Sequence, residues 1–275
     1  MSPVAKIEVQ EGRFSGGLPY LMLGSGQPLV YLCGFTPNNR NPRAGLERAL
    51  TLRTLTPLAS AGFQVYFTNR WPGMAADTTF ADMAERHAEA IGDYFGGPVD
   101  VLGASTGGSL ALQLIADRPD VVRKAVVAAA AYTLGPRAKR LQADLLRAIE
   151  ETGRYPAQGV LDSMQGKLRS RWIRALLTPV AIMTAKQVRI ENPTDTIAVL
   201  RAEDAFNVRD RLDDIQTEAL VICGAQDDFW TPEMFAETAC RLPRGRLIMY
   251  PNRGHGLIIV PEFFRDVTAF LRDKT

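Results

Sequence analysis

The sequence predicts an α/β protein in which a mostly parallel sheet carries helices on both faces. Three observations lead to this fold class. Short apolar runs alternate with longer segments of helical spacing along most of the chain, which is the order of βα units. Runs such as Pro28–Cys33 show no polar alternation, as is typical of strands buried on both faces. The 275 residues are 46% hydrophobic and 23% charged, which is the composition of a globular protein with a substantial core.

The elements expected before residue 133 follow from spacing and punctuation. Val4–Val9 and Leu18–Leu23 alternate between glycine-rich breaks and predict an antiparallel edge pair. After them, buried strands alternate with helices. The strands are expected at Pro28–Cys33, Phe63–Thr68, Val99–Leu102 and Arg123–Ala131, and the helices at Leu46–Ala61, Thr79–Phe95 and Ser109–Ala116.

The alternation stops between Thr133 and Leu212, where the pattern predicts helices and no strand. Two or three helices fit there, at Arg137–Thr152, at Val160–Leu177 and in a less periodic stretch around Asp195–Glu203. The alternation then resumes with strands at Ala219–Cys223 and Arg246–Tyr250 and helices at Pro232–Leu242 and Pro261–Arg272. We therefore expect one core, formed by residues 1–132 and 213–275, interrupted by a helical cap at residues 133–212. An insertion of about 80 residues in a compact domain suggests a lid.

A candidate nucleophile lies where the Val99–Leu102 strand turns into the following helix. The sequence there is Gly103-Ala104-Ser105-Thr106-Gly107. A serine on so sharp a turn adopts strained backbone angles that expose its hydroxyl at the carboxyl edge of the sheet. The glycines on either side leave room for the strand–helix crossing. Ser105 is therefore the predicted nucleophile.

A serine nucleophile requires a base, and the chain has only two histidines. His87 shares a helical stripe with apolar residues and is expected to be a core residue. His255 follows the Arg246–Tyr250 strand, in a loop at the edge where Ser105 should emerge. A carboxylate must orient this histidine. Asp227 and Asp228 both follow the Ala219–Cys223 strand at the same edge, and the residues alone leave both open.

The oxyanion formed during attack needs amide donors, and two are predicted. One is the Thr106 N–H, directly after the nucleophile, and the other is the Phe35 N–H in the loop after the Pro28–Cys33 strand. Aromatic and apolar residues near the predicted edge or in the cap are expected to form the substrate pocket. The candidates are Tyr132, Met164, Trp172 and Trp230.

Composition excludes several other classes of protein. Lys and Arg total 32 against 30 Asp and Glu, a balance that does not favour nucleic acid or an anionic membrane surface as partner. Three cysteines without a CxxC pair exclude a disulfide scaffold and a cysteine zinc site, and no HExxH motif is present. The first residues lack the features of a secretory signal, and the longest apolar run, Ala125–Tyr132, is too short to span a bilayer. We expect a soluble, cytoplasmic protein whose partner is a small-molecule substrate, with the oligomeric state undetermined.

These motifs resemble the α/β-hydrolase superfamily, in its lidded branch similar to epoxide hydrolases and haloperoxidases. The resemblance runs through LVYLCGF, GASTG, Phe206–Ile215, LVICGAQDD and YPNRGHG. It implies an eight-stranded sheet, a helical cap, no cofactor or metal, and Asp227 rather than Asp228 as the acid. The family usually has His-Gly where this chain has Cys33-Gly34, and Asp-x-Arg-Gly where it has Asn69-Arg70-Trp71-Pro72-Gly73. A serine nucleophile disfavours dehalogenase and epoxide hydrolase activity, which use an aspartate.

The sequence thus predicts a serine hydrolase that cleaves small or medium carboxylic esters through an acyl-enzyme. The same triad serves C–C bond hydrolysis, amide hydrolysis and perhydrolysis, because the cap determines selectivity. A third hypothesis, from a different class, is a ligand receptor that keeps the fold without turnover.

Overall fold

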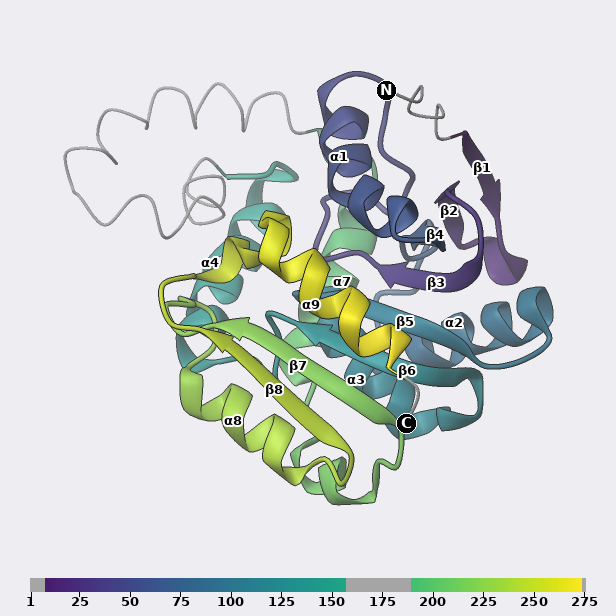
Figure 1. Ribbon diagram of the computed structural model, residues 1–275. Coiled ribbons are helices and arrows are strands. Elements are labelled where there is room, and N and C mark those ends of the chain that lie inside the picture. Colours follow the sequence, from purple (N-terminus) through teal and green to yellow (C-terminus); the bar gives the residue numbers. More distant parts are fainter. Residues whose placement is uncertain (1–7, 157–188, 274–275) are drawn as a thin grey trace.

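A computed structural model describes residues 8–156 and 189–273 of the chain (Figure 1). Its centre is an eight-stranded sheet with the order β1-β2-β4-β3-β5-β6-β7-β8, in which β2 pairs antiparallel with both β1 and β4 and all other neighbouring pairs are parallel. The strands are β1 (Val9–Arg13), β2 (Pro19–Leu23), β3 (Gln27–Leu32), β4 (Phe63–Thr68), β5 (Val99–Ala104), β6 (Val122–Ala128), β7 (Glu218–Gly224) and β8 (Gly245–Tyr250).

Helices cover both faces of the sheet (Figure 1). One face carries α1 (Leu46–Ser60) and α9 (Pro261–Arg272), and the other carries α2 (Phe80–Phe95), α3 (Thr106–Asp117) and α8 (Pro232–Arg241). Two further helices, α4 (Pro136–Thr152) and α7 (Pro193–Ala205), lie between β6 and β7 in the chain. Short 3₁₀ segments occur at Ser15–Gly17, Pro119–Val121, Arg209–Asp214 and His255–Ile259. The predicted fold class, a mostly parallel eight-stranded sheet with helices on both faces, is confirmed.

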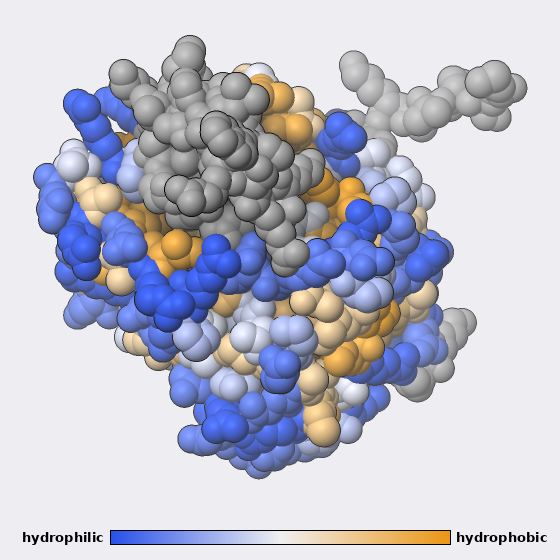
Figure 2. Space-filling view, turned by 90° about the vertical axis from the view of Figure 1, so that its left-hand side faces the viewer, coloured by the Kyte–Doolittle hydropathy of each residue, from blue (hydrophilic) through white to orange (hydrophobic). Residues whose placement is uncertain are grey.

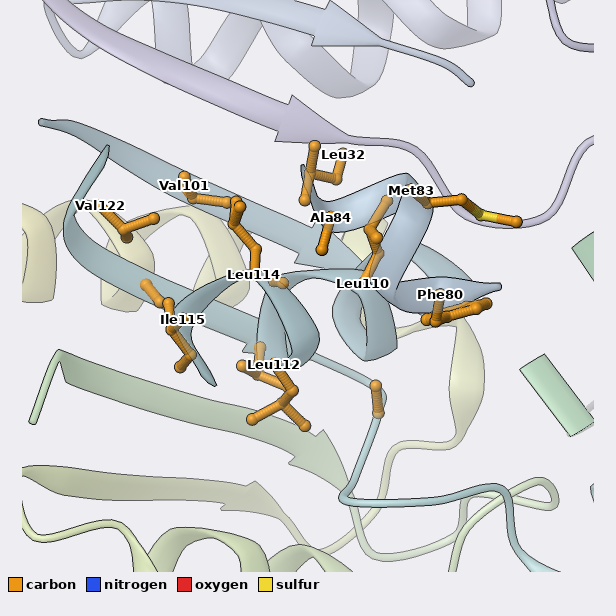
Figure 3. Close-up of a cluster of buried hydrophobic side chains, with 14 of the residues drawn as sticks. Leu32, Phe80, Met83, Ala84, Val101, Leu110, Leu112, Leu114, Ile115 and Val122 are labelled. Carbon is orange, nitrogen blue, oxygen red and sulfur yellow. The ribbon is translucent and has the colours of Figure 1, made fainter. Parts of the chain in front are cut away.

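Successive residues of the central strands point into two separate cores because side chains alternate across a strand. In β5, Val101 belongs to the core under α2 and α3, whereas Leu102 belongs to the core under α1 and α9. Every residue of β5 and β7 is buried, which explains the uninterrupted apolar runs in the sequence. Figure 3 shows the first core, where leucines of α3 pack between the sheet and α2.

Among the described residues, the strongly periodic elements lie where the sequence predicts them, and the first edge strand differs. Most of the predicted edge strand at Val4–Val9 lies outside the described residues; the described strand β1 runs from Val9 to Arg13, past the predicted end, and pairs with β2 from Val9↔Leu23 to Arg13↔Pro19. A strand at the sheet's edge needs no apolar alternation to pair through its backbone, so its sequence carries a weak signal. The predicted helix at Val160–Leu177 lies outside the described residues.

The predicted cap region has two described helices that pack against each other. Gln142 of α4 donates from Nε2 to the Leu200 carbonyl of α7 at 2.7 Å, and Ile149 and Leu200 share a small apolar cluster. The amide of Val208 then donates to the Tyr132 carbonyl at 2.9 Å, which closes this part of the chain onto the end of β6. The division into residues 1–132, 133–212 and 213–275 stays a prediction.

The described surface is mixed in character. Figure 2 shows hydrophobic residues gathered in a few patches among hydrophilic ones. Large exposed apolar side chains include Leu46, Leu50 and Ile259. In the part of the chain that the structure describes, no helix combines the length and the apolar character needed to cross a membrane.

Candidate active site

Ser105 occupies the turn between β5 and α3 in a conformation that few non-glycine residues adopt. Its φ is 56° and its ψ is −124°, a strained combination for a residue with a side chain. A Cβ on Gly103 would lie 2.0 Å from the Gly107 carbonyl oxygen, and one on Gly107 would lie 2.1 Å from the Leu32 carbonyl oxygen. Both glycines are therefore required by the close approach of the backbone, as the sequence predicts.

The structure brings Ser105, His255 and Asp227 together at the carboxyl edge of the sheet. His255 Nε2 lies 3.0 Å from Ser105 Oγ, and His255 Nδ1 lies 2.9 Å from Asp227 Oδ2. Because a carboxylate only accepts, Nδ1–H donates to Asp227 and Nε2 accepts from the serine hydroxyl. The imidazole therefore has the tautomer that a general base for Ser105 requires.

Asp227 is held rigidly, whereas Asp228 faces away. The Asp227 side chain is fully buried, and its Oδ1 accepts from the amides of Phe229 at 2.7 Å and Trp230 at 3.3 Å. Asp228 instead pairs with Arg137 at 2.8 Å. Of the two acids that the residues left open, Asp227 contacts His255.

Two aromatic side chains flank the imidazole of His255. The Phe229 ring lies 4.6 Å from it, and the Trp230 ring stacks on it at 5.7 Å with an interplanar angle of 16°. The Trp230 indole is fixed in turn, since its Nε1–H donates to the Thr133 carbonyl at 2.7 Å. These rings restrict the rotation of the imidazole.

The amides of Phe35 and Thr106 flank the nucleophile. Thr106 directly follows Ser105, and a Cβ on Gly34 would lie 3.4 Å from Ser105 Cβ, so the Phe35 loop runs beside the elbow. Among the described residues, neither amide N–H has a hydrogen-bond acceptor within the protein. Both donors are free for an oxygen of a substrate.

Arg70 supports this loop, and sequence reasoning gave it no such role. Arg70 is 2% exposed, and its guanidinium donates to the carbonyls of Cys33 at 3.4 Å and Gly34 at 3.2 Å, and to Oγ1 of Thr36 at 3.3 Å. Burial raises the pKa of Cys33, so its thiol stays neutral. The position of Arg70 directly after β4 was the available signal, because that strand ends at the same edge as the site.

Glu203 is the second group that the sequence did not single out. It lies on α7, is 3% exposed, and accepts from Thr106 Oγ1 at 3.0 Å through its Oε2. Burial raises the pKa of Glu203 to about 7, against the opposing effects of the Thr106 hydroxyl and the charges of Arg70 and His255. No motif signals such a residue, since an acid in a helical segment is ordinarily solvated.

Ser105 and His255 open into a cavity of about 490 Å³, a size ordinary for small-molecule sites. Trp230 lines it as predicted. Tyr132 does not, which corrects that prediction: its ring packs 5.5 Å from the Arg209 guanidinium instead. Met164 and Trp172 lie outside the described residues.

His87 is a core residue, and among the described residues it forms no hydrogen bond with Ser105, His255 or Asp227. It is 2% exposed, and its Nδ1 lies 2.7 Å from the Met83 carbonyl oxygen. Burial lowers the pKa of His87 to about 4. Within residues 8–156 and 189–273, no group of three or more His, Cys, Asp or Glu side chains is arranged to hold a metal ion.

Known proteins resemble the chain in sequence and in fold. A family model described as the alpha/beta hydrolase family matches residues 30–267. The putative carbamate hydrolase RutD of Caulobacter vibrioides is 27% identical over 222 residues, covering 74% of this chain and 81% of the relative. The structure of the putative non-heme bromoperoxidase BpoC from Mycobacterium tuberculosis has a TM-score of 0.70 at 20% identity, covering 99% of this chain and 98% of that one. An esterase from Exiguobacterium antarcticum has a TM-score of 0.71 at 17% identity, covering 97% and 100%.

The two lines of comparison agree with the geometry of the molecule. The family model spans most of the chain, and the matched structures share its fold over nearly their full length. The chain therefore belongs to the alpha/beta hydrolase family and is an enzyme with hydrolase activity.

Proposed function

We propose that the protein is a serine hydrolase of small or medium carboxylic esters. One observation carries this proposal: Ser105, His255 and Asp227 form a continuous hydrogen-bonded chain, with links of 3.0 and 2.9 Å, that opens into an apolar cavity. Side chains in that arrangement activate a hydroxyl for attack on a carbonyl carbon.

In the acylation step, Ser105 Oγ attacks the ester carbonyl while its proton moves to His255 Nε2. Asp227 stabilises the imidazolium through the Nδ1–H hydrogen bond. The carbonyl oxygen becomes an oxyanion, and the amides of Phe35 and Thr106 donate to it. The imidazolium then protonates the departing alkoxide, and the C–O bond breaks to leave an acyl group on Ser105 and a free alcohol.

In the deacylation step, water replaces the alcohol. His255 Nε2 takes a proton from the water as it attacks the acyl carbon, the same two amides stabilise the second oxyanion, and Ser105 Oγ leaves with the proton returned by His255. The carboxylic acid is released and the site is restored. No group outside the described residues is needed for these proton transfers.

The cavity wall favours an uncharged substrate. Apolar side chains predominate along it, including Leu134, Leu145, Leu200 and Phe229, and no Lys or Arg of the described residues lines it. Burial of an anionic substrate group without a cationic partner would be unfavourable. We therefore propose an ester whose acyl and alcohol groups are both neutral.

Carbamate or amide hydrolysis is the second candidate function. The relative named a putative carbamate hydrolase favours it, and a carbamate carbonyl would meet the same nucleophile and amide donors. The triad also permits C–C bond hydrolysis and perhydrolysis, so the leaving group has to be tested. A receptor without turnover stays the remaining hypothesis from a different class.

The test is labelling with a fluorophosphonate probe, followed by rates on a matched substrate series. Wild type and the control Ser60→Ala, which removes an exposed serine at the end of α1, should be labelled stoichiometrically, and Ser105→Ala should not be labelled. p-Nitrophenyl esters of increasing acyl length, a p-nitrophenyl carbamate and an anilide then identify the bond. Labelling of Ser105→Ala at the wild-type rate would refute the nucleophile, and turnover of the carbamate alone would favour the second candidate.

A further inference from the structure

Glu203 connects α7 to the first turn of the helix that follows the nucleophile. Its Oε2 accepts from Thr106 Oγ1 at 3.0 Å. Its other oxygen, Oε1, is buried without a hydrogen-bond partner among the described residues, and so is the hydroxyl of Ser109, which lies beside the same carboxyl. The Ser109 hydroxyl could serve Oε1 in either protonation state, by donating to the carboxylate or by accepting from Oε1–H of the neutral acid.

The surroundings of Glu203 leave its charge uncompensated by an ion pair. Among the described residues it forms no salt bridge, and the groups whose positive charge acts on it are Arg70 after β4 and, when protonated, His255 after β8. From the other elements packed against α7, α2 contributes the buried His87, and α4 contributes Lys139, whose Nζ donates to the Asp204 carbonyl. A carboxylate in this position is desolvated, which favours its neutral form.

We propose that Glu203 is a positioning residue for the proposed hydrolysis: as a neutral acid it holds Thr106 and Ser109, and as a carboxylate it adds negative charge beside the oxyanion. This inference rests on the proposed function. Thr106 supplies one of the two proposed oxyanion amides, so a fixed Thr106 keeps that donor aimed at the carbonyl oxygen. On ionisation, the Oε1 proton goes to solvent, and the new charge stabilises the imidazolium of His255.

Glu203→Gln separates these two effects. Its amide can accept from Thr106 Oγ1 and donate to Ser109 Oγ, as the neutral acid does, but it cannot ionise. Glu203→Ala removes both contacts. Asp204→Asn is the matched control, because Asp204 is exposed on the same helix and undergoes the same chemical change.

The first measurement is infrared difference spectroscopy of the free protein. In wild type, the C=O band of a protonated carboxyl should disappear between about pH 6 and pH 8, and Glu203→Gln should lack this change while Asp204→Asn retains it. This readout needs no substrate and no turnover. A wild-type protein whose carboxyl signal in this range matches that of Glu203→Gln would overturn the inference.

The second measurement is the pH dependence of Ser105 labelling by the fluorophosphonate probe. Without the Glu203 charge, the imidazole protonates less readily, so the acid limb should move down by about half a pH unit in Glu203→Gln. Asp204→Asn should keep the wild-type profile, and Glu203→Ala should label about tenfold more slowly at every pH.

The outcomes distinguish the two proposals. Identical profiles for wild type and Glu203→Gln would overturn the role of Glu203 alone. Absence of labelling in wild type would overturn the proposed function and, with it, this role, whatever the infrared result.

Discussion

Replacement of Glu203 by glutamine should stabilise the protein at neutral pH. Burial raises the pKa of Glu203 from 4.5 to about 7. A carboxyl with a raised pKa stabilises the folded state only where it keeps its proton, so its contribution is present below pH 4.5 and is lost as the pH rises through 7. A difference of 1 between the pKa in the folded and unfolded states corresponds to about 1.4 kcal/mol of unfolding free energy. The wild type should therefore lose about 3 kcal/mol of unfolding free energy from this group across that range.

Urea unfolding followed by tryptophan fluorescence provides the assay. Glu203→Gln and wild type should have similar unfolding free energies near pH 5, and the variant should be more stable by about 2–3 kcal/mol near pH 8. Asp204→Asn should stay within about 0.5 kcal/mol of wild type at both values, because its side chain is exposed. A variant that is less stable than wild type at pH 8, or a difference that does not change with pH, would refute the reasoning.

Three further perturbations test the rest of the site. Asp227→Asn should lower kcat on the best ester by about 10⁴-fold through loss of the required tautomer, whereas Asp228→Asn, whose carboxylate pairs with Arg137, should stay within about twofold. Arg70→Met should lower kcat by about 10²-fold with little effect on KM, because the loop bearing the Phe35 amide loses its support; an unchanged kcat would contradict this role. Burial lowers the pKa of His87 to about 4, so wild-type stability should fall by about 3 kcal/mol as the pH drops from about 6.5 toward 4, and urea titrations of His87→Leu should lack that contribution.

Much of the fold was predictable because its elements carry strong periodic signals. The β4 strand has the bounds that the apolar run Phe63–Thr68 predicts, since a strand buried on both faces shows a continuous apolar sequence. The described edge strand β1 continues past the predicted end at Val9 to Arg13, which the sequence pattern did not indicate because backbone pairing alone fixes that strand. The bounds of α7 exceed the predicted Asp195–Glu203 by two residues at each end, where Asn192 caps the first turn and Pro193 begins it.

The residues of the proposed triad were predictable from scarcity and topology, whereas the groups around them were not. The chain offers two histidines, and only His255 follows a strand at the edge where Ser105 emerges. Adjacent acids gave no way to choose between Asp227 and Asp228, because the choice depends on the direction of each side chain. Tyr132 was misassigned for the same reason: its position after β6 was right for a wall residue, but its ring turns toward Arg209.

Arg70 and Glu203 escaped prediction because each contradicts the rule that charged residues are solvated. Both are almost completely buried, and neither forms an ion pair within the described residues. An interior without them would be more stable on general grounds. Both lie against the backbone of the proposed oxyanion donors, Arg70 on the loop that carries the Phe35 amide and Glu203 on Thr106. The destabilising groups are thus concentrated where donor geometry would matter most, since a misplaced oxyanion amide is expected to cost about 10²-fold or more in rate. Arg70→Met and Glu203→Ala should therefore impair catalysis more than they impair folding, which is the reverse of what a purely structural role would produce.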